Sequence, residues 1–391
     1  MNKWDLIVIG VGAVGSAALR AAAEAGARVL GVEQYAPAHA RSSSHGHSRI
    51  FRHAYFEHPD YVPLLRHSTA RFESLEREAG ASLLHRCGVL VAGDADSEAV
   101  HGSLASAQRW GLAVDALDAP ALRARFPWFQ VGDDAIGAFE ANAGLVRPEA
   151  AVHASLRVAG AGGAELRMTE CVRRVVEDAS GVSVETDTGT ERASAAIIAA
   201  GPWTSQLLPE LAPLLTVTRQ VQAWMLPAAG VDASAMPCWF LDRGPERRAI
   251  YGLAPDPLAR VEANGTPSPS IYPKTAFHGS DVVVDPDAGA APVDDDDIAT
   301  LRGAYQTFAP SLAGVAVHAA TCLYTMSPDG HFLVGTRHGA RRTHFAAGLS
   351  GHGFKLGPAL GDALVDLALH GRTALPIGFL SPGRFATRGR R

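Results

Sequence analysis

The sequence predicts an α/β and α+β fold, in which a Rossmann-type dinucleotide-binding domain is combined with a second domain built on a mixed β-sheet. Three observations support this prediction. Residues 5–25 run from an apolar strand pattern through a glycine-rich turn into an alanine-rich helix. Residues 219–324 instead alternate aromatic and β-branched side chains with many prolines, which is typical of β-structure. The length of 391 residues is sufficient for two domains.

The N-terminal segment has the pattern of a complete βαβ unit. Residues 5–9 are apolar and rich in β-branched side chains, as in a buried parallel strand. We expect the following helix to run through about Ala25, with Gly26 as its stop. Residues 28–33 then form the second strand of the unit.

The turn between the first strand and the helix has the spacing GxGxxG, in Gly10, Gly12 and Gly15. Gly10 permits the tight turn, Gly12 lets a pyrophosphate approach the backbone, and Gly15 allows the helix to pack closely on the strand. The free N–H groups at the helix N-terminus suit the phosphates. Glu33 ends the second strand, where a carboxylate can bind both ribose hydroxyls and disfavours NADP. The motif predicts dinucleotide binding, but it does not separate FAD from NAD.

The remaining α/β segments follow in three blocks. After a polar loop over residues 34–60, helical patterning resumes near Tyr61, and residues 89–140 carry a short strand and helical segments with a turn at Pro127-Trp128. The elements expected later are a helix from Ala151, strands at 172–176, 182–186 and 195–200, a turn at Thr188-Gly189, and a strand and helix over 345–369. We therefore assign residues 1–85, 147–217 and 325–391 to the dinucleotide-binding domain. Residues 86–146 and 218–324 form the substrate-binding domain.

Two other segments are polar. Residues 254–297 are rich in Pro, Gly, Asp and Ser, so loops are expected to dominate there. The acidic run at residues 294–297 suits a helix N-terminus, where carboxylates are stabilised. The basic tail after Arg384 is expected to be disordered.

Composition excludes several classes of protein. The net charge of −5 argues against a broad nucleic-acid-binding face. No apolar run reaches the roughly 18–20 residues that a membrane span needs, and no leader pattern precedes the first strand. The four cysteines are widely spaced without a CxxC pair, which favours a reducing compartment. We expect a cytoplasmic protein without a nucleic-acid or membrane partner, and we expect it to be a monomer.

Two further segments have side chains suited to a ligand. The loop over residues 42–53 combines small residues with Arg and His side chains, which suit a planar anionic cofactor or a carboxylate. Two alternative interpretations of this loop are a solvated basic loop and a metal site. The chain has no HxxxH pair on a helix and no cysteine pair nearby, so no metal is expected. Residues 348–355 form a glycine-rich entry to a helix and place Lys355 at its start.

These segments together resemble the monomeric sarcosine oxidase and N-methyl-L-tryptophan oxidase family, FAD-dependent amine oxidases of the D-amino-acid oxidase-like superfamily. The resemblance is carried by the GxGxxG start, by His45-Gly46-His47-Ser48-Arg49-Ile50-Phe51-Arg52-His53-Ala54-Tyr55, by Ala320-Thr321-Cys322-Leu323-Tyr324 and by Gly351-His352-Gly353-Phe354-Lys355. It extends over nearly the whole chain, in order. It implies FAD rather than NAD, an amino acid substrate with a secondary amine, and O₂ as the electron acceptor.

The resemblance also implies roles for individual residues. Cys322 matches the thiol that the family joins to the flavin 8α-methyl group, and His45 and Arg49 match positions close to the flavin ring. Arg52 and Lys355 match the pair that holds the substrate carboxylate. Matches in the second domain are Lys274, the oxygen-activating lysine, His278, an active-site histidine, and Tyr251 and Tyr324, which line the substrate cavity. The expected cofactor contacts are Gly10, Gly12, Gly15, Glu33, Ser42, Arg49, Cys322, Gly351, Gly353 and Lys355.

Departures and alternatives remain. His47 stands where the family usually has Asp, and the spacing from Tyr251 to Lys274 is longer than expected because of a Pro/Ser-rich insertion at residues 254–273. The segments at residues 322–329 and 348–350 resemble N-methyl-L-tryptophan oxidase slightly more than sarcosine oxidase. The alternatives are an NAD-dependent dehydrogenase, a nucleotide-binding protein without catalysis, or a flavin oxidase of a cyclic imino acid such as proline or pipecolate.

Overall fold

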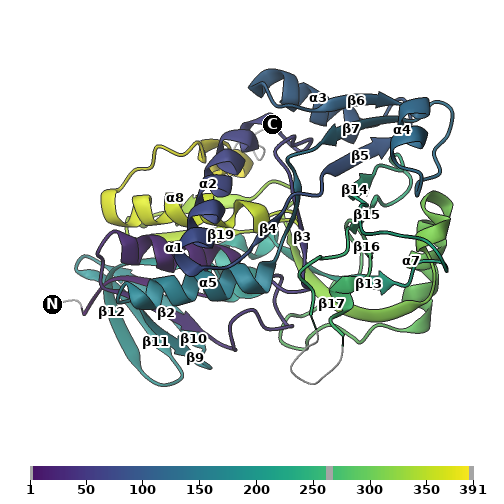
Figure 1. The fold of residues 1–391 in the computed structure, drawn as a ribbon. Helices are drawn as coiled ribbons and strands as arrows, with labels where there is room; N and C mark the ends of the chain where they lie inside the picture. The colour runs from purple at the N-terminus through teal and green to yellow at the C-terminus, as the bar shows by residue number, and fades with distance from the viewer. Residues whose placement is uncertain (1–2, 261–266, 387–391) are drawn as a thin grey trace.

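Two large sheets and a small one make up the structure, a computed structural model that describes residues 3–260 and 267–386. In Figure 1 the first sheet and its helices lie on the left, and the second sheet lies on the right. Within the described residues the arrangement confirms the predicted α/β and α+β class.

The first sheet is built around the N-terminal strand. Its strand order is β10-β11-β12-β1-β2-β9, with β19 beside β12 and β18 beside β19. The contacts of β1 with β2 and β12, of β2 with β9 and of β12 with β19 are parallel. The bounds are β1 Trp4–Ile9, β2 Val29–Glu33, β9 Glu165–Met168, β10 Val172–Asp178, β11 Gly181–Thr186, β12 Thr190–Ile198, β18 Leu333–Thr336 and β19 Thr343–Ala347.

Helices cover one face of this sheet. An apolar cluster packs α1 and α8 onto β1 and β12, and α2 and α5 lie beside them (Figure 1). Ala-rich and Gly-rich sequences allow these helices to approach closely, since a Cβ at Gly361 would lie only 2.7 Å from the backbone nitrogen of Ala18. The bounds are α1 Ala13–Glu24, α2 Val62–Ala79, α5 Pro148–Ala161 and α8 Gly357–His370.

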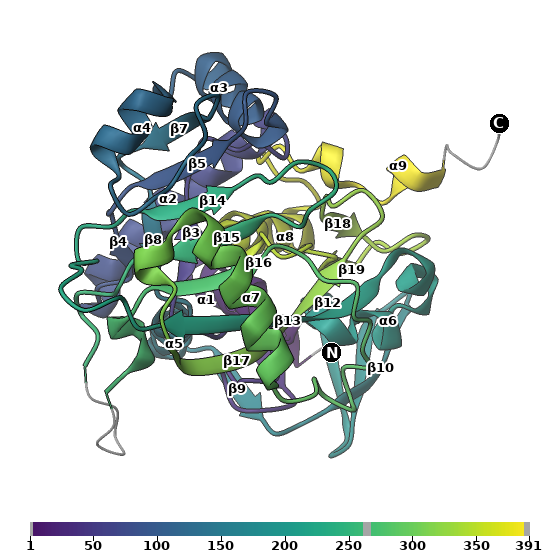
Figure 2. The ribbon, with the colours of Figure 1, turned by 90° about the vertical axis from the view of Figure 1, so that its right-hand side faces the viewer.

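The second sheet has the order β17-β13-β16-β15-β14-β5-β7-β6. Helix α7 packs against it through a second apolar cluster, and Figure 2 places α7 in front of this sheet. The strand bounds are β5 Val89–Gly93, β6 Asp115–Asp118, β7 Ile136–Glu140, β13 Thr216–Met225, β14 Cys238–Leu241, β15 Ile250–Leu253, β16 Lys274–Phe277 and β17 Ala316–Met326. The helices of this part are α3 Glu98–Trp110, α4 Ala119–Arg125 and α7 Asp295–Phe308.

A small three-stranded sheet lies between the two large ones in Figure 1. It consists of β3 Arg49–Phe51, β8 Gly144–Val146 and β4 Leu84–His85, in the order β3-β8-β4. The chain passes through this region when it crosses from α2 to β5 and from β7 to α5, whereas it crosses from β12 to β13 and from β17 to β18 elsewhere. The division into two domains with the predicted boundaries stays a prediction.

Several expected elements differ in detail. Residues 89–140 contain three strands rather than one, and the exposed edge strand β6 lacked an apolar alternation that would have revealed it. Helix α5 begins at Pro148, three residues before the expected start, because proline is favoured in a first helical turn. The described residues of the segment 254–297, which are 254–260 and 267–297, are mostly loop, as expected, but they include β16 and the start of α7.

The predicted helix start at residues 294–297 is confirmed. Asp294 caps α7, and its carboxylate accepts a hydrogen bond from the backbone of Asp297 while the Asp297 carboxylate accepts one in return. The prediction of disorder after Arg384 is wrong for Phe385 and Ala386, because α9 (Gly383–Ala386) includes them. In the same helix, Arg384 is paired with Asp329. Residues 387–391 lie outside the described part of the chain.

One buried ion pair joins distant segments. Arg147, the residue before α5, donates hydrogen bonds of 2.6 and 2.5 Å to the two carboxylate oxygens of Asp256, in the loop after β15. Both residues are buried, at 9% and 8% exposure. An unpaired charge in such a position is costly, because the remaining ion has no water to solvate it.

We therefore predict that Asp256→Asn lowers the free energy of unfolding by about 3 kcal/mol, measured by urea denaturation. The matched control is Asp133→Asn, whose partner Arg123 forms an ion pair with a carboxylate that is 98% exposed. The control should cost less than about 1 kcal/mol. Equal losses in the two variants would contradict the role given to the buried pair.

Candidate functional site

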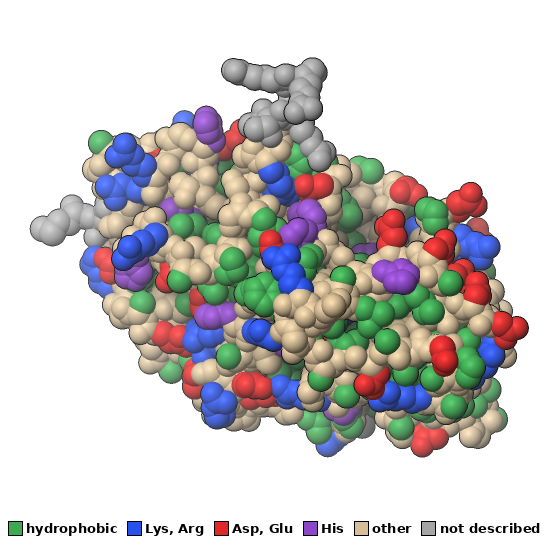
Figure 3. All heavy atoms as spheres, turned by 90° about the horizontal axis from the view of Figure 1, so that it is seen from above, with side chains coloured by type: hydrophobic (Ala, Val, Ile, Leu, Met, Phe, Trp, Pro, Cys, Tyr) green, Lys and Arg blue, Asp and Glu red, His purple; other side chains and the backbone are tan. Residues whose placement is uncertain are grey.

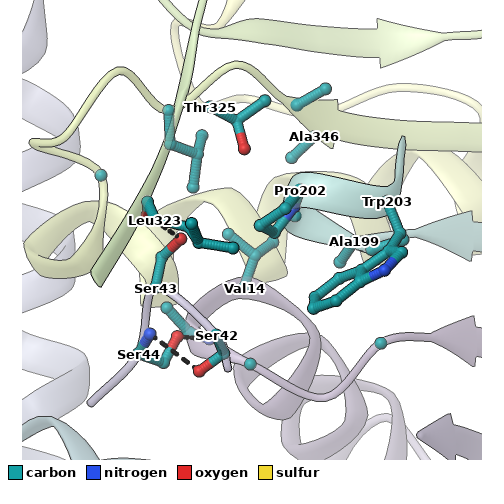
Figure 4. A pocket seen from close by; sticks show the side chains of 18 of the residues that line it. Val14, Ser42, Ser43, Ser44, Ala199, Pro202, Trp203, Leu323, Thr325 and Ala346 are labelled. Carbon is teal, nitrogen blue, oxygen red and sulfur yellow. Dashed lines mark hydrogen bonds between the residues drawn. The ribbon is translucent and has the colours of Figure 1, made fainter. Parts of the chain in front are cut away.

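A cavity opens at the carboxyl ends of the central parallel strands, which is where doubly wound folds bind their ligands. The open space, including its mouth, is about 1320 Å³. One end is lined by Glu33, Cys171 and Trp203, and the other by Arg49, Tyr324 and Gly351. In Figure 4 the loop of Ser42, Ser43 and Ser44 faces Leu323 and Thr325 on one side, with Pro202 and Trp203 on the other.

The glycine motif shapes the wall of this cavity. Gly10 has a φ of 81°, and a Cβ there would lie 2.6 Å from the carbonyl oxygen of Ala199 on the neighbouring strand. A Cβ at Gly15 would lie 1.8 Å from the Gly10 carbonyl oxygen. Gly12 lines the cavity and is the residue before α1. These positions match the separate roles that the spacing predicts for the three glycines.

Glu33 lies at the end of β2 and is held in place by backbone groups. Its carboxylate accepts hydrogen bonds from the N–H groups of Val11, at 2.9 Å, and Tyr35, at 3.1 Å. Burial raises its pKa, although these hydrogen bonds act in the opposite direction. A carboxylate fixed at the end of this strand is placed to accept hydrogen bonds from ribose hydroxyls.

The serine loop forms the opposite wall. The Ser44 hydroxyl accepts a hydrogen bond from the Ala13 backbone N–H at 3.1 Å, which satisfies one free donor at the start of α1. The Ser43 hydroxyl donates to the Leu323 carbonyl oxygen at 2.5 Å, which ties the loop to β17 (Figure 4). Ser42, which is predicted to bind the cofactor, lines the cavity, and Ser43 and Ser44 are additional lining residues that were not named individually from sequence.

Other lining residues were also missed. The segment Gly201-Pro202-Trp203 was recognised only as the end of a buried strand, yet all three residues line the cavity. Among the described residues, two buried polar atoms that line it have no hydrogen-bond partner, Nδ1 of His39 and Oγ1 of Thr325. Unpaired buried polar atoms are unfavourable, so these atoms fit a polar ligand that extends across the cavity.

The late glycine segment closes the other end. Gly348, Ser350 and Gly351 have positive φ angles of 59°, 45° and 80°. A Cβ at Gly351 would lie 2.2 Å from the Tyr324 ring, so glycine allows this aromatic side chain to pack on the turn. Gly353 also lines the cavity. Lys355 lies in the short 3-10 helix Phe354–Leu356 that leads into α8.

Arg49 connects the cavity to the β17 strand. Its guanidinium donates to the Ser43 carbonyl oxygen at 3.2 Å and to the Cys322 sulfur at 3.5 Å. Cys322 is buried, at 5% exposure. It is not among the cavity-lining residues, although its neighbours Leu323 and Tyr324 are.

Lys274 is fully inside the protein, at 1% exposure, although it follows a loop-rich insertion. Its ammonium donates hydrogen bonds to the carbonyl oxygens of Gly46, at 2.8 Å, and Ser48, at 2.5 Å. It also lies 5.4 Å from the centre of the Trp224 ring. Burial is the main cause of its strongly lowered pKa, and the charge of Arg49 adds to it. Lys274 and Arg49 therefore belong to one cationic group around residues 43–49.

His45 occupies a different hollow. It is buried and lines a second space with His47, Glu149 and Trp224, rather than the cavity that contains Gly12. Burial lowers its pKa to about 3, and the charge of Arg49 contributes. Glu149 was missed from sequence, and it accepts hydrogen bonds from the backbone N–H groups of Gly46 and His47 at 2.6 and 2.9 Å. The structure therefore places His45 near Arg49 but off the cavity wall.

Arg52 is paired with a carboxylate that the sequence analysis did not identify. Its guanidinium donates to both oxygens of Glu57 at 2.9 and 2.8 Å, and to the Ala54 carbonyl oxygen at 2.5 Å. Burial alone would raise the pKa of Glu57, but the charges of Arg52, His352 and Lys355 bring it down to about 2. The two partners are five positions apart along a loop, a spacing that has no helical or strand periodicity to reveal it.

Lys355 lies beside this pair. Its ammonium donates to the His352 carbonyl oxygen at 2.9 Å and to the Tyr55 hydroxyl at 3.3 Å. Its pKa is lowered to about 7, mainly by burial and also by the nearby charge of Arg52, while Glu57 acts in the opposite direction. Arg52 and Lys355, predicted as a pair, therefore lie within electrostatic reach of each other.

The aromatic residues predicted to line a substrate cavity are also grouped. The hydroxyls of Tyr251 and Tyr324 are 3.4 Å apart, and the His278 ring lies 6.4 and 6.2 Å from the two tyrosine rings. Burial lowers the pKa of His278 to about 4, although Glu57 raises it. The neutral imidazole and two phenols form a polar aromatic group next to the Arg52–Lys355 pair.

The described residues carry side chains of both charges and no cluster of metal-binding side chains. On the face shown in Figure 3, outside the grey atoms, acidic and basic side chains both occur and no broad basic area is visible. Within residues 3–260 and 267–386, no group of three His, Cys, Asp or Glu side chains is placed to hold a metal ion. No helix in the same ranges is both long and apolar enough to cross a membrane.

Comparison with known proteins identifies the family. The family profile described as FAD dependent oxidoreductase matches residues 5–367. The chain is 40% identical to monomeric sarcosine oxidase of Streptomyces avermitilis over 388 residues, covering 98% of each protein. It is 36% identical to N-methyl-L-tryptophan oxidase of Salmonella newport over 386 residues, covering 98% of this chain and 99% of that protein.

Solved structures agree with this assignment. The chain superposes on the open form of NikD, an unusual amino acid oxidase, with a TM-score of 0.82, 28% identity and 98% coverage of both chains. L-proline dehydrogenase from P. horikoshii has the same fold, with a TM-score of 0.80, 18% identity and 99% coverage of both chains. The dinucleotide that the glycine motif left open is therefore FAD, and the chain belongs to the family of FAD-dependent oxidoreductases.

Proposed function

We propose that this protein is an FAD-dependent oxidase of secondary amino acids, in particular N-methylated ones. The observation that carries the proposal is the pair of buried cations Arg52 and Lys355 beside His278, Tyr251 and Tyr324. The substrate would lose a hydride equivalent and a proton across its N–C–H bond, and the imine would hydrolyse to an aldehyde and an amine. Molecular oxygen would take up the two electrons and two protons as H₂O₂.

FAD supplies the two-electron redox chemistry when it is bound, while the protein supplies orientation and electrostatics. Gly12 and the start of α1 would hold the pyrophosphate, and Glu33 the ribose hydroxyls. Ser42, Arg49, Gly351 and Gly353 would complete the contacts, together with the missed residues Ser43 and Ser44. The unpaired atoms of His39 and Thr325 support a ligand along the same cavity.

The substrate carboxylate would be bound by Arg52 and Lys355. Both side chains are nearly excluded from water, so a carboxylate between them would form strong charge-assisted hydrogen bonds. Glu57 holds the Arg52 guanidinium in a fixed orientation and offsets part of the positive charge. The substrate side chain would lie against Tyr251, Tyr324 and His278, which are apolar on their faces and polar at their edges.

The identity of the N-substituted amino acid is the open part of the proposal. The relatives include both a sarcosine oxidase and an N-methyl-L-tryptophan oxidase, at 40% and 36% identity. A cyclic imino acid such as proline or pipecolate has the same N–C–H bond and is the second candidate. The support for this candidate comes from the grouped carboxylate site and not from the ring of the substrate.

The test is a peroxide-coupled screen of the purified protein over sarcosine, N-methylalanine, N-methyltryptophan, proline and pipecolate. We expect H₂O₂ with at least one N-methyl amino acid, and none with the corresponding N-methylamine that lacks a carboxylate. Peroxide formation with proline or pipecolate alone would favour the second candidate. A protein that reduces its flavin with none of the five compounds would contradict the proposal.

We also propose that the protein acts as a cytoplasmic monomer without a nucleic-acid or membrane partner. The four cysteines are free thiols, which suits a reducing compartment. One relative is named a monomeric oxidase. A single 41 kDa species in size-exclusion chromatography with light scattering is the expected result, and a dimer would contradict it.

The pH dependence of carboxylate binding tests the role of Lys355. Its pKa lies at about 7, so the cation is present below this pH and is lost as pH rises through it. The Kd of acetate, followed by perturbation of the flavin spectrum, should rise about tenfold between pH 6 and pH 8. Lys355→Met should weaken binding at pH 6 and abolish the pH dependence.

Arg52→Ala is the second variant in which the Kd of acetate is measured as a function of pH. It should raise Kd about ten- to a hundredfold, because a charge-assisted interaction is lost. It should keep a pH dependence, moved to higher pH, because the charge of Arg52 is one cause of the lowered Lys355 pKa. A Kd independent of pH in the wild type would remove Lys355 from the carboxylate site.

Lys274 would serve the oxygen step rather than the amine step. As O₂ accepts an electron it acquires negative charge, and a fixed cation shielded from water stabilises that charge. Lys274→Met should therefore reduce its flavin with substrate, without O₂, at a rate within about an order of magnitude of wild type. Its reoxidation by O₂ should slow by at least about a hundredfold, roughly 2.7 kcal/mol of transition-state stabilisation. Stopped-flow traces with normal reoxidation would exclude this role.

Cys322 would carry the flavin covalently through its sulfur and the 8α-methyl group. Its contact with Arg49 and the position of its neighbours on the cavity wall support this attachment. Acid-precipitated wild-type protein should stay yellow, whereas Cys322→Ser should release its flavin into the supernatant. Release from the wild type would contradict the attachment, and Cys171→Ser serves as the control that keeps its flavin.

A further inference from the structure

Two thiols outside the candidate flavin site lie next to each other. The sulfur atoms of Cys87 and Cys238 are 3.7 Å apart, although the residues are separated by 151 positions in the chain. Cys87 lies between β4 and β5, and Cys238 is the first residue of β14, the parallel neighbour of β5. The Cys238 backbone N–H donates to the Gly88 carbonyl oxygen at 3.0 Å, so the two backbones are in direct contact at this point.

The two thiols differ in exposure. Cys238 is fully buried, whereas Cys87 is partly exposed. A small neutral oxidant can therefore reach Cys87 first, and Cys238 is protected until Cys87 has reacted. A disulfide needs a sulfur–sulfur distance of about 2.05 Å, so the two sulfurs must approach by roughly 1.7 Å for the bond to form.

We propose that Cys87 and Cys238 form a peroxide-sensitive thiol pair that closes reversibly to a disulfide. The Cys87 thiolate attacks one oxygen of H₂O₂ and becomes a sulfenic acid, releasing hydroxide. The Cys238 thiol then attacks the sulfenic sulfur, forming the S–S bond and releasing water. The oxidant is hydrogen peroxide, which is also the product of the proposed oxidase reaction.

The surroundings of Cys87 favour the first step. The hydrogen bond with the Cys238 thiol lowers the pKa of Cys87, and backbone hydrogen bonds at Cys238 and Leu145 support this, while burial acts in the opposite direction. Cys171 is the reference thiol: it is also partly exposed, but it lies near the Gln34 side chain on the wall of the candidate flavin cavity rather than beside a second sulfur. Burial raises the pKa of Cys171.

The pair lies behind the proposed substrate wall. Cys87, Cys238 and Tyr251 pack in the same apolar cluster, and β14 is paired with β15, which carries Tyr251. A disulfide at this position would tie β14 to the segment before β5 and move the strand behind Tyr251. This consequence rests on the proposed function, whereas the thiol chemistry does not.

The experiment treats the reduced, flavin-containing protein with graded H₂O₂ added from outside, so that it does not depend on turnover. After quenching with catalase, free thiols are alkylated and the peptides are analysed by mass spectrometry. We expect Cys87 and Cys238 to lose their free thiols together, at least tenfold faster than Cys171, in a linked peptide that dithiothreitol separates. In Cys238→Ser, Cys87 should stop at a sulfenic acid that dimedone captures, and in Cys87→Ser, Cys238 should keep its thiol.

Oxidation of Cys171 as fast as Cys87, or loss of the Cys87 thiol without a linked peptide in the wild type, would overturn the proposal.

A comparison of the wild type with Cys87→Ser also tests whether the disulfide affects the substrate wall at Tyr251. Peroxide should change the KM of the accepted substrate at least twofold in the wild type, reversibly, and leave Cys87→Ser unchanged. Equal changes in both proteins would show that the pair does not act on the cavity, while the peptide result would still decide whether the disulfide forms.

Discussion

The burial of positive charge is the constraint on which the candidate site depends. Arg49, Arg52, Lys274 and Lys355 lie largely inside the protein, and only Arg52 has a carboxylate directly bonded to it. A buried cation is unfavourable unless hydrogen bonds and opposite charge compensate for it. The other three cations are held by carbonyl oxygens of the backbone, including those of Ser43, Gly46, Ser48 and His352. An anionic ligand would supply the compensation that the protein leaves incomplete.

This requirement also explains the path of the chain. The loop after β2 turns its carbonyl oxygens inward around Arg49 and Lys274, and a left-handed residue at His47, with a φ of 64°, is part of that turn. Glu149, in the first turn of α5, accepts two backbone N–H groups of the same loop. Strands β16 and β17 of the second sheet carry Lys274 and Tyr324, and the loop after β2 forms hydrogen bonds with both strands. The fold therefore serves mainly to place cations and carbonyl dipoles where water is excluded.

Much of this could be predicted from sequence, because the relevant patterns are local. The GxGxxG turn and the capping of α7 each depend on residues a few positions apart, and Glu33 is located by the strand pattern that ends the βαβ unit. The fold class and the cofactor follow from these patterns together with the resemblance of three later segments. Lys274 was expected near the flavin only by alignment across an insertion, and the structure buries it among backbone carbonyls rather than leaving it in solvent.

What could not be predicted depends on contacts between distant segments. Glu57 and Glu149 are ordinary acidic residues in sequence, and their roles follow only from the cations and amides that the fold brings to them. His45 was expected beside the flavin, and its side chain instead lines a neighbouring hollow. The contact of Cys87 with Cys238 likewise arises from the pairing of β5 with β14, for which a spacing of 151 residues contains no signal.

The central claim is that a carboxylate completes the cationic site and returns a proton to Lys355. Calorimetric titration of the flavin-containing protein with acetate at pH 7.5, in two buffers with different ionisation enthalpies, measures this directly. Because the Lys355 pKa is about 7 without a ligand, binding should take up more than about half a proton at pH 7.5 and almost none at pH 6. Acetate binding without proton uptake at pH 7.5, or with the same uptake in Lys355→Met, would contradict the account.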